Sequence, residues 1–217
     1  MKDAVTELLE AASFLVVRGL GRGREKKFLG NGQPVIGIPG WEAVWMPDGL
    51  GKFINSRKLP GELTFFDFQR GYIDSYVDSL GKIIENYEKP LVVGFSLGGI
   101  IAARYAQKHG WKGVDKIVTI GSPFAGVKWF DYCKFMGGAC EDMRPGSDFL
   151  DNLRQMKVPV GKKLIGIYSK NDFHIGKPLR HIQAMPFSET HIVQSAGHND
   201  LGDHCRWWEK ILEVHLN

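Results

Sequence analysis

The residues of this chain best suited to chemistry are five in its middle, Gly94-Phe95-Ser96-Leu97-Gly98. The pattern G-x-S-x-G is typical of a tight turn from a strand into a helix, with the serine hydroxyl exposed at the turn. Its two glycines leave room for the strand and the helix to approach each other. Because a chain with 27 glycines can contain this pattern by chance, the flanking sequence must support it.

The segments on either side of Ser96 supply that support. Residues 90–95 form a short apolar run, which is typical of a buried parallel strand. Residues 97–106 are rich in alanine and other apolar side chains, and His109-Gly110 is typical of a helix end. The sequence therefore predicts a strand, a turn that carries Ser96, and a helix, in that order.

A serine hydroxyl needs an adjacent base to act as a nucleophile at neutral pH. Asp172 ends a polar turn after a predicted strand, and His198 lies in a predicted loop after the last strand. The order Ser, Asp, His is the one that accompanies this type of turn. We predict that His198 takes the proton of Ser96 and that Asp172 fixes the imidazole tautomer. The rival candidates are His174 and His191 for the base, and Asp200 and Asp203 for the acid.

Chemistry of this kind also needs N–H donors for the negative oxygen of a tetrahedral intermediate. The backbone N–H of Leu97, directly after the serine, is the first candidate. The backbone N–H of Trp41 is the second, because Pro39-Gly40-Trp41 follows the first predicted strand. These two groups form the predicted oxyanion hole.

The elements that position these residues alternate between strands and helices. Apolar side chains spaced three and four apart predict a helix over residues 73–87, Ser147 can cap another, and a last helix carries Trp208, Ile211 and Leu212 on one face. This alternation predicts an α/β fold with a mostly parallel sheet of about six strands and helices on both faces. The carboxyl ends of the strands then share one edge, where the three candidates would meet. The predicted strands span residues 34–38, 63–67, 91–95, 116–120, 163–168 and 190–194.

A length of 217 residues suits a single domain over residues 1–217. Residues 124–160 are either a small cap over the site or a long crossover. Hydrophobic residues make up 43% and charged residues 24% of the chain, as in ordinary soluble globular proteins. The net charge of +4 does not indicate nucleic-acid binding.

No apolar run near the start is long enough to span a membrane, and acidic residues precede the run over residues 11–17, unlike in a secretory signal. We therefore predict a cytoplasmic protein. The basic stretch 18–27 leaves contact with a membrane surface open, although a solvated loop is the simpler reading. Three cysteines do not form a disulfide framework, but Cys133 and Cys140 could pair in an exported protein. The sequence implies no metal and no organic cofactor, and it does not indicate the oligomeric state.

Several stretches resemble the α/β-hydrolase superfamily, most closely its bacterial lipase and esterase branch. The resemblance covers residues 33–217 and implies the α/β-hydrolase fold. The chain departs from the common pattern where Pro39-Gly40 replaces His-Gly, and residues 1–32 do not show the first two strands of an eight-stranded sheet. The similar stretches are residues 35–41, 94–99, 119–126, 143–150 and 197–201.

The resemblance implies hydrolysis of carboxylic esters through an acyl-enzyme on Ser96, with a small-molecule or lipid ester as substrate. The same triad also serves acyl transfer and thioester cleavage, because the pocket and the access of water decide between these reactions. A binding protein without activity on the same scaffold is a further alternative. The short chain argues against a large mobile lid.

Overall fold

The structure is a computed structural model, and it describes residues 26–40, 46–64, 71–128, 138–194, 196–203 and 208–216. In this part of the chain, seven strands form one sheet in the order β1-β3-β2-β4-β5-β6-β7. All neighbouring strands run parallel except β1 (Lys26–Phe28), which pairs antiparallel with β3 (Gly61–Leu63). The predicted, mostly parallel α/β sheet is therefore confirmed.

The central strands lie where the sequence predicts them, whereas the sheet edge near β1 differs. β1 was not predicted, because a three-residue edge strand with two lysines has no apolar pattern. β3 begins two residues earlier than predicted, at Gly61, where an added Cβ would lie 2.1 Å from the carbonyl oxygen of Val35. A glycine that reads as a breaker is thus required for pairing with β2. The other strands are β2 (Val35–Ile38), β4 (Leu91–Phe95), β5 (Lys116–Ile120), β6 (Lys163–Ser169) and β7 (Glu189–Val193).

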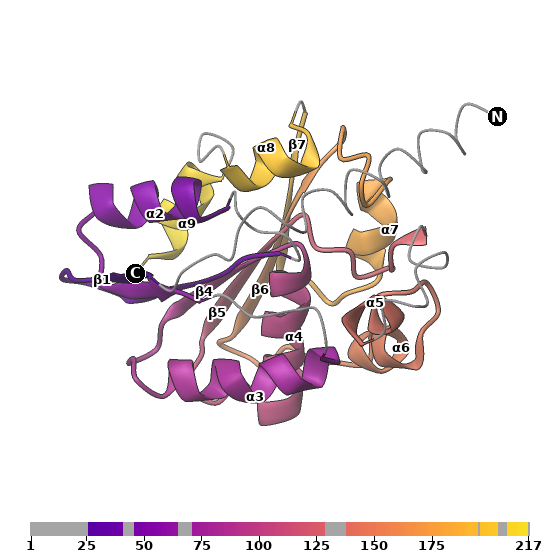
Figure 1. Ribbon diagram of the computed structural model, residues 1–217, viewed down its shortest axis with the longest axis horizontal. Coiled ribbons are helices and arrows are strands. Elements are labelled where there is room, and N and C mark those ends of the chain that lie inside the picture. The colour runs from indigo at the N-terminus through magenta and orange to yellow at the C-terminus, as the bar shows by residue number, and fades with distance from the viewer. Residues whose placement is uncertain are drawn as a thin grey trace.

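Helices cover both faces of the sheet (Figure 1). Below the sheet in that view lie α3 (Ile73–Ile84) and α4 (Leu97–His109); above it lie α2 (Met46–Ser56), α8 (His198–Asp203) and α9 (Glu209–His215). Alternation along β4 explains the two layers. Val92 packs in the apolar core between the sheet and helices α3 and α4. Val93 and Phe95 pack in the core between the opposite face of the sheet and helices α2, α8 and α9.

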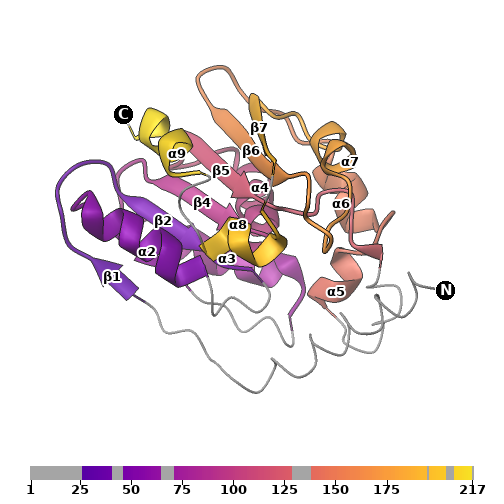
Figure 2. The ribbon, with the colours of Figure 1, turned by 90° about the horizontal axis from the view of Figure 1, so that it is seen from above.

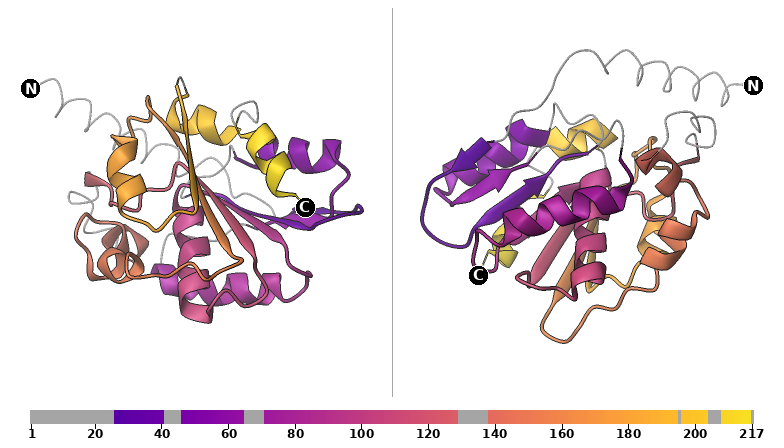
Figure 3. Two further views of the ribbon diagram at one scale, coloured as in Figure 1. Left: turned by 180° about the vertical axis from the view of Figure 1, so that it is seen from behind. Right: turned by 60° about the horizontal axis from the view of Figure 1, so that its bottom comes forward.

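Three short helices gather together at one side of the sheet (Figures 2 and 3). They are α5 (Ala139–Asp142), α6 (Asp148–Leu153) and α7 (Pro178–Gln183). Ser147 caps α6 as predicted, since its Oγ accepts a hydrogen bond of 3.2 Å from the N–H of Leu150. Arg104 of α4 pairs with Asp74 of α3 and donates to Asn152 of α6, which ties the three helices together.

Part of the interval over residues 124–160 lies outside the described residues, so its role as a cap stays a prediction. Cys140 is buried in α5 and Cys133 is not described, which leaves their pairing untested. Within the described ranges, no helix combines the length and the apolar character needed to cross a bilayer.

Candidate active site

Ser96 lies between β4 and α4 in a backbone conformation with a positive φ, at φ 51° and ψ −120°. Residues with a Cβ seldom adopt a positive φ, so the surrounding structure must hold this one in place. The N–H of Ser96 donates to the carbonyl of Ile120 at 2.8 Å, and the carbonyl of Ser96 accepts from the N–H of Gly99 at 3.1 Å. The Ser96 hydroxyl does not cap α4, so it stays available for chemistry.

Two glycines allow neighbouring backbone to approach the Ser96 turn. A Cβ on Gly98 would lie 2.0 Å from the carbonyl oxygen of Ile38, and a Cβ on Gly40 would lie 2.8 Å from the Cβ of Ser96. Both distances are shorter than van der Waals contact, so a side chain at either position would push the segments apart. The loop after β2 therefore lies directly against Ser96.

Of the two predicted oxyanion donors, the structure describes Leu97 but not Trp41. Leu97 is the first residue of α4, so its N–H has no acceptor inside the helix and lies at the positive end of the helix dipole. Trp41 lies outside the described residues. Its neighbour Gly40, the last described residue before the gap, lies against Ser96.

The candidate base and acid are in direct contact. The distance from His198 Nδ1 to Asp172 Oδ2 is 2.6 Å, and both side chains are buried. The other carboxylate oxygen of Asp172 accepts a hydrogen bond of 3.2 Å from the N–H of Ile175. With Nδ1 on the carboxylate, Nε2 is the nitrogen left for a substrate or a nucleophile.

The sequence predicted that His198 lies in a loop, but in the structure it is the first residue of α8. The N–H of Leu201 donates to the carbonyl of Gly197 at 2.9 Å, and the carboxylate of Asp200 accepts from the N–H of Gly197 at 3.4 Å. A short polar segment thus closes a helical turn through local hydrogen bonds that its composition does not reveal.

The Ser96 turn and the His198–Asp172 pair meet at the carboxyl edge of the sheet. A Cβ on Gly121, directly after Ile120, would lie 3.3 Å from His198 Cε1 and 3.4 Å from Asp172 Oδ2. The ring of His198 packs on that of Phe95, with 4.9 Å between centroids. No hydrogen bond between the described residues joins the Ser96 hydroxyl to the imidazole.

Ser169, which the sequence analysis did not single out, connects the acid and base loops. It is the last residue of β6 and is fully buried. Its hydroxyl donates to the carbonyl of Ala196 at 2.5 Å and accepts from the N–H groups of Ala196 and Asn171, each at 3.2 Å. A single serine at a strand end carries no sequence signal for this role.

His181 anchors the turn that follows Asp172. Its Nδ1 accepts from the N–H of Ala125 at 2.9 Å, so the ring proton is on Nε2, which donates to the carbonyl of Ile175 at 2.8 Å. Burial lowers the pKa of His181 to about 4. The neutral imidazole therefore links this turn to the loop after β5.

The rival residues lie in other surroundings. His174 stacks on His198, whereas His191 pairs with Glu189 on β7 at 2.6 Å. Asp200 bonds the backbone of Gly197, and the side chain of Asp203 is not described. Of the acidic candidates whose side chains are described, Asp172 is the one that contacts His198.

Known proteins resemble this chain in architecture. A family model described as alpha/beta hydrolase fold matches residues 43–139, and a search of curated protein sequences gave no significant match. Among solved structures, the mature lipase from Bacillus licheniformis is 12% identical with a TM-score of 0.69. That alignment covers 91% of this chain and 100% of the lipase.

Two further solved structures are similar as well. A monoacylglycerol lipase from Paleococcus ferrophilus is 15% identical with a TM-score of 0.65, covering 90% of this chain and 97% of its own. A carboxylesterase structure from the thaumarchaeon Nitrososphaera gargenis is 16% identical with a TM-score of 0.63, covering 89% and 93%. The sheet order, the family match and these neighbours confirm the resemblance to the α/β-hydrolase superfamily, and the chain has the α/β-hydrolase fold.

Proposed function

We propose that the protein is a serine hydrolase that cleaves carboxylic esters through an acyl-enzyme on Ser96. The observation that carries the proposal is the buried contact of 2.6 Å between His198 Nδ1 and Asp172 Oδ2. It lies at the sheet edge that also holds Ser96 in its conformation with a positive φ. A buried imidazole–carboxylate pair near a partly buried serine is the arrangement that activates a hydroxyl.

In the first half of the proposed reaction, the Oγ of Ser96 attacks the ester carbonyl carbon while Nε2 of His198 takes the hydroxyl proton. The hydroxyl first rotates toward the imidazole. Asp172 stabilises the imidazolium through the proton on Nδ1. The N–H of Leu97 and the proposed N–H of Trp41 donate to the oxyanion. The intermediate collapses, Nε2 returns the proton to the leaving alkoxide, and the alcohol departs.

In the second half, water replaces the alcohol. Nε2 of His198 takes a proton from water as the hydroxide oxygen attacks the acyl carbon on Ser96. When the second tetrahedral intermediate collapses, the proton returns to Ser96 Oγ and the carboxylic acid leaves. No cofactor takes part in these steps.

We propose a small-molecule or lipid ester as substrate, because the similar structures include two lipases and a carboxylesterase. Phe173 follows Asp172 directly in the chain and is 80% exposed. An exposed aromatic side chain next to the proposed acid is consistent with an apolar acyl or alkyl group.

Labelling with a fluorophosphonate tests the proposed nucleophile. The wild type should gain one adduct, and Ser96→Ala and His198→Ala should lose it. Ser122→Ala is the matched control, because Ser122 is a buried serine close to the same turn whose Oγ has no hydrogen-bond partner. Labelling that survives Ser96→Ala would contradict the proposal.

A chain-length series of nitrophenyl esters then tests the reaction. Turnover that Ser96→Ala abolishes would support ester hydrolysis, and the preferred length separates an esterase from a lipase. Labelling without turnover of any ester would favour acyl transfer or thioester cleavage, which added acceptor alcohols and acyl thioesters distinguish.

A further inference from the structure

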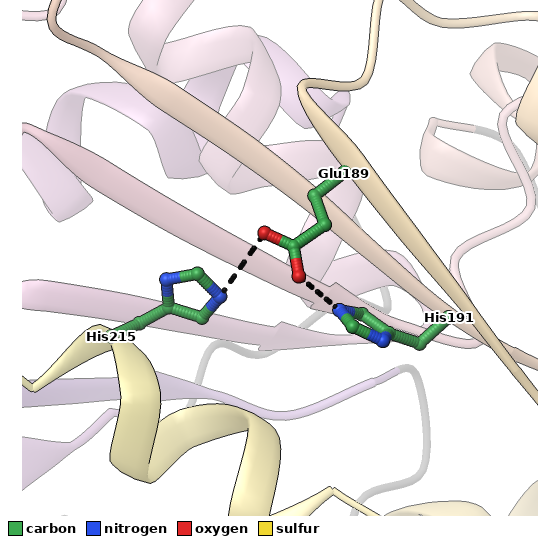
Figure 4. Close-up of side chains that lie close together, drawn as sticks. All are labelled: Glu189, His191 and His215. Carbon is green, nitrogen blue, oxygen red and sulfur yellow. Dashed lines mark hydrogen bonds and ion pairs between the residues drawn. The ribbon is translucent and has the colours of Figure 1, made fainter.

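A second polar cluster lies between the edge strand β7 and the C-terminal helix α9. Side chains alternate along β7, and Val193 packs against the apolar core that α9 covers. Glu189 and His191 share the parity of Val193, so polar groups occupy positions where a strand normally buries apolar ones. His215, in the last turn of α9, is buried against them. Figure 4 shows the three polar side chains pointing toward one another.

The distances within this cluster are short. The Nε2 of His191 lies 2.6 Å from Glu189 Oε1, and the Nε2 of His215 lies 3.6 Å from Glu189 Oε2. One ligand atom from each residue lies within 4.8 Å of the other two. Among the residues that the structure describes, no other group of three histidine, cysteine, aspartate or glutamate side chains converges in this way.

We propose that Glu189, His191 and His215 bind a divalent transition-metal ion, of which Zn²⁺ is the best fit. Two imidazole nitrogens and one carboxylate oxygen form a typical three-ligand zinc set, with water in the fourth position. Bonds of about 2.0–2.2 Å in a tetrahedron place ligand atoms roughly 3.4 Å apart. The distance of 3.6 Å between His215 and Glu189 is close to this value.

To bind the ion, His191 Nε2 and Glu189 Oε1 must move apart from their present distance of 2.6 Å, and both side chains are able to move. The side chains of His191 and Glu189 are 32% and 39% exposed, so they can rotate apart from their present hydrogen bond to admit an ion. His215, at 3% side-chain exposure, supplies the fixed point. The open coordination position would therefore face solvent.

Nearby charges shape the selectivity of the proposed site. Lys116 and Lys163 lie close enough to act on His215, and Lys116 Nζ also donates to the His215 carbonyl at 3.0 Å. The positive charges of these two lysines weaken the binding of any metal ion that is held by electrostatic attraction alone. Imidazole nitrogens instead favour Zn²⁺, Cu²⁺ or Ni²⁺ over Mg²⁺ and Ca²⁺, which prefer oxygen ligands. A bound ion would fasten α9 to the sheet edge.

Calorimetric titration of ZnCl₂ into untagged, chelator-stripped full-length protein tests the proposal. We expect one ion per chain, and binding about tenfold or more weaker in Glu189→Gln and in His191→Gln. At a zinc concentration one hundred times the wild-type Kd, the wild-type Tm should rise by about 5–10 °C, while the Tm of each variant should rise by about half as much or less. Co²⁺ in place of zinc should give a visible absorption band that Glu189→Gln loses.

The matched control is His109→Gln. His109 Nε2 lies 3.6 Å from Asp78, which repeats the His215–Glu189 contact without a third ligand, so this variant should bind zinc as the wild type does. Because His215→Gln could disturb the packing of α9, the partly exposed His191 provides the decisive variant. Absence of wild-type zinc binding, unchanged binding in both variants, or equal binding of Mg²⁺ would each overturn the proposal.

Discussion

The imidazole of His174 lies stacked on that of His198, with ring centroids 5.2 Å apart and ring planes inclined by 29°. Burial, and secondarily the neighbouring His198, lower the pKa of His174, while Asp172 opposes the shift. His174 is therefore neutral at neutral pH. When it is protonated, it places a positive charge against the imidazolium that the proposed mechanism forms on His198.

Replacing His174 with phenylalanine should separate the charge of this side chain from its ring packing. At neutral pH we expect kcat of His174→Phe to stay close to that of the wild type. As the pH falls, the wild type should lose activity more steeply, because only its residue 174 becomes charged. His174→Ala should lower kcat roughly two- to tenfold through the lost ring contact. Parallel pH profiles of kcat for wild type and His174→Phe would show that the charge has no influence.

Asp172→Asn should lower kcat on the order of ten thousand-fold, because an amide cannot hold the required imidazole tautomer. Asp200→Asn should change kcat less than about threefold, since the Asp200 carboxylate bonds the Gly197 backbone rather than His198. Steady-state kinetics on one nitrophenyl ester compares the two variants. A large loss of kcat in Asp200→Asn, together with near-normal kcat in Asp172→Asn, would show that Asp200 rather than Asp172 is the acid of the triad.

Ser169→Ala should lower both stability and turnover. It leaves two N–H groups and one carbonyl without their partner, at a cost of about 1–3 kcal/mol. The loosened acid and base loops should lower kcat about tenfold. Ser147→Ala is the control, because losing the α6 cap costs about 1 kcal/mol and should leave kcat unchanged. Urea unfolding and kinetics on both variants decide whether Ser169 positions the site or only stabilises the fold.

Acid should destabilise the protein through His181. Since its folded-state pKa of about 4 lies below the ordinary value of 6.5, the unfolded chain binds more protons between these values. Its contribution to stability is full above about pH 6.5 and falls as the pH drops toward 4, by about 3 kcal/mol. Unfolding free energies measured by urea over this range should therefore fall less in His181→Gln than in the wild type. Equal slopes would contradict this assignment.

The local sequence pattern was sufficient to predict the β4–Ser96–α4 unit. An apolar run, a turn flanked by glycines and an alanine-rich helix each depend on residues that are adjacent in the sequence. It was not sufficient for α2, whose Pro47, Gly49 and Gly51 read as breakers although tertiary packing makes the segment helical. The start of α8 at His198 was missed for a similar reason, since its hydrogen bonds involve polar side chains in a short segment.

Contacts between residues distant in sequence account for the rest. Order along the chain pointed to Asp172 and His198, and the structure places their side chains in contact. Nothing in sequence marks Ser169 as a partner of Ala196, or His215 as a neighbour of Glu189, because strand register and helix packing create these contacts. A residue that acts by joining two elements becomes visible only once both elements are placed.

The positive φ of Ser96 implies a conflict between durability and reactivity. A residue with a Cβ in this conformation costs about 1–3 kcal/mol, whereas glycine adopts it freely. Ser96→Gly should therefore unfold at a higher temperature than Ser96→Ala, although both lack the hydroxyl, and scanning calorimetry can compare them. The position proposed for the nucleophile is thus one where the fold would be more robust with no side chain at all.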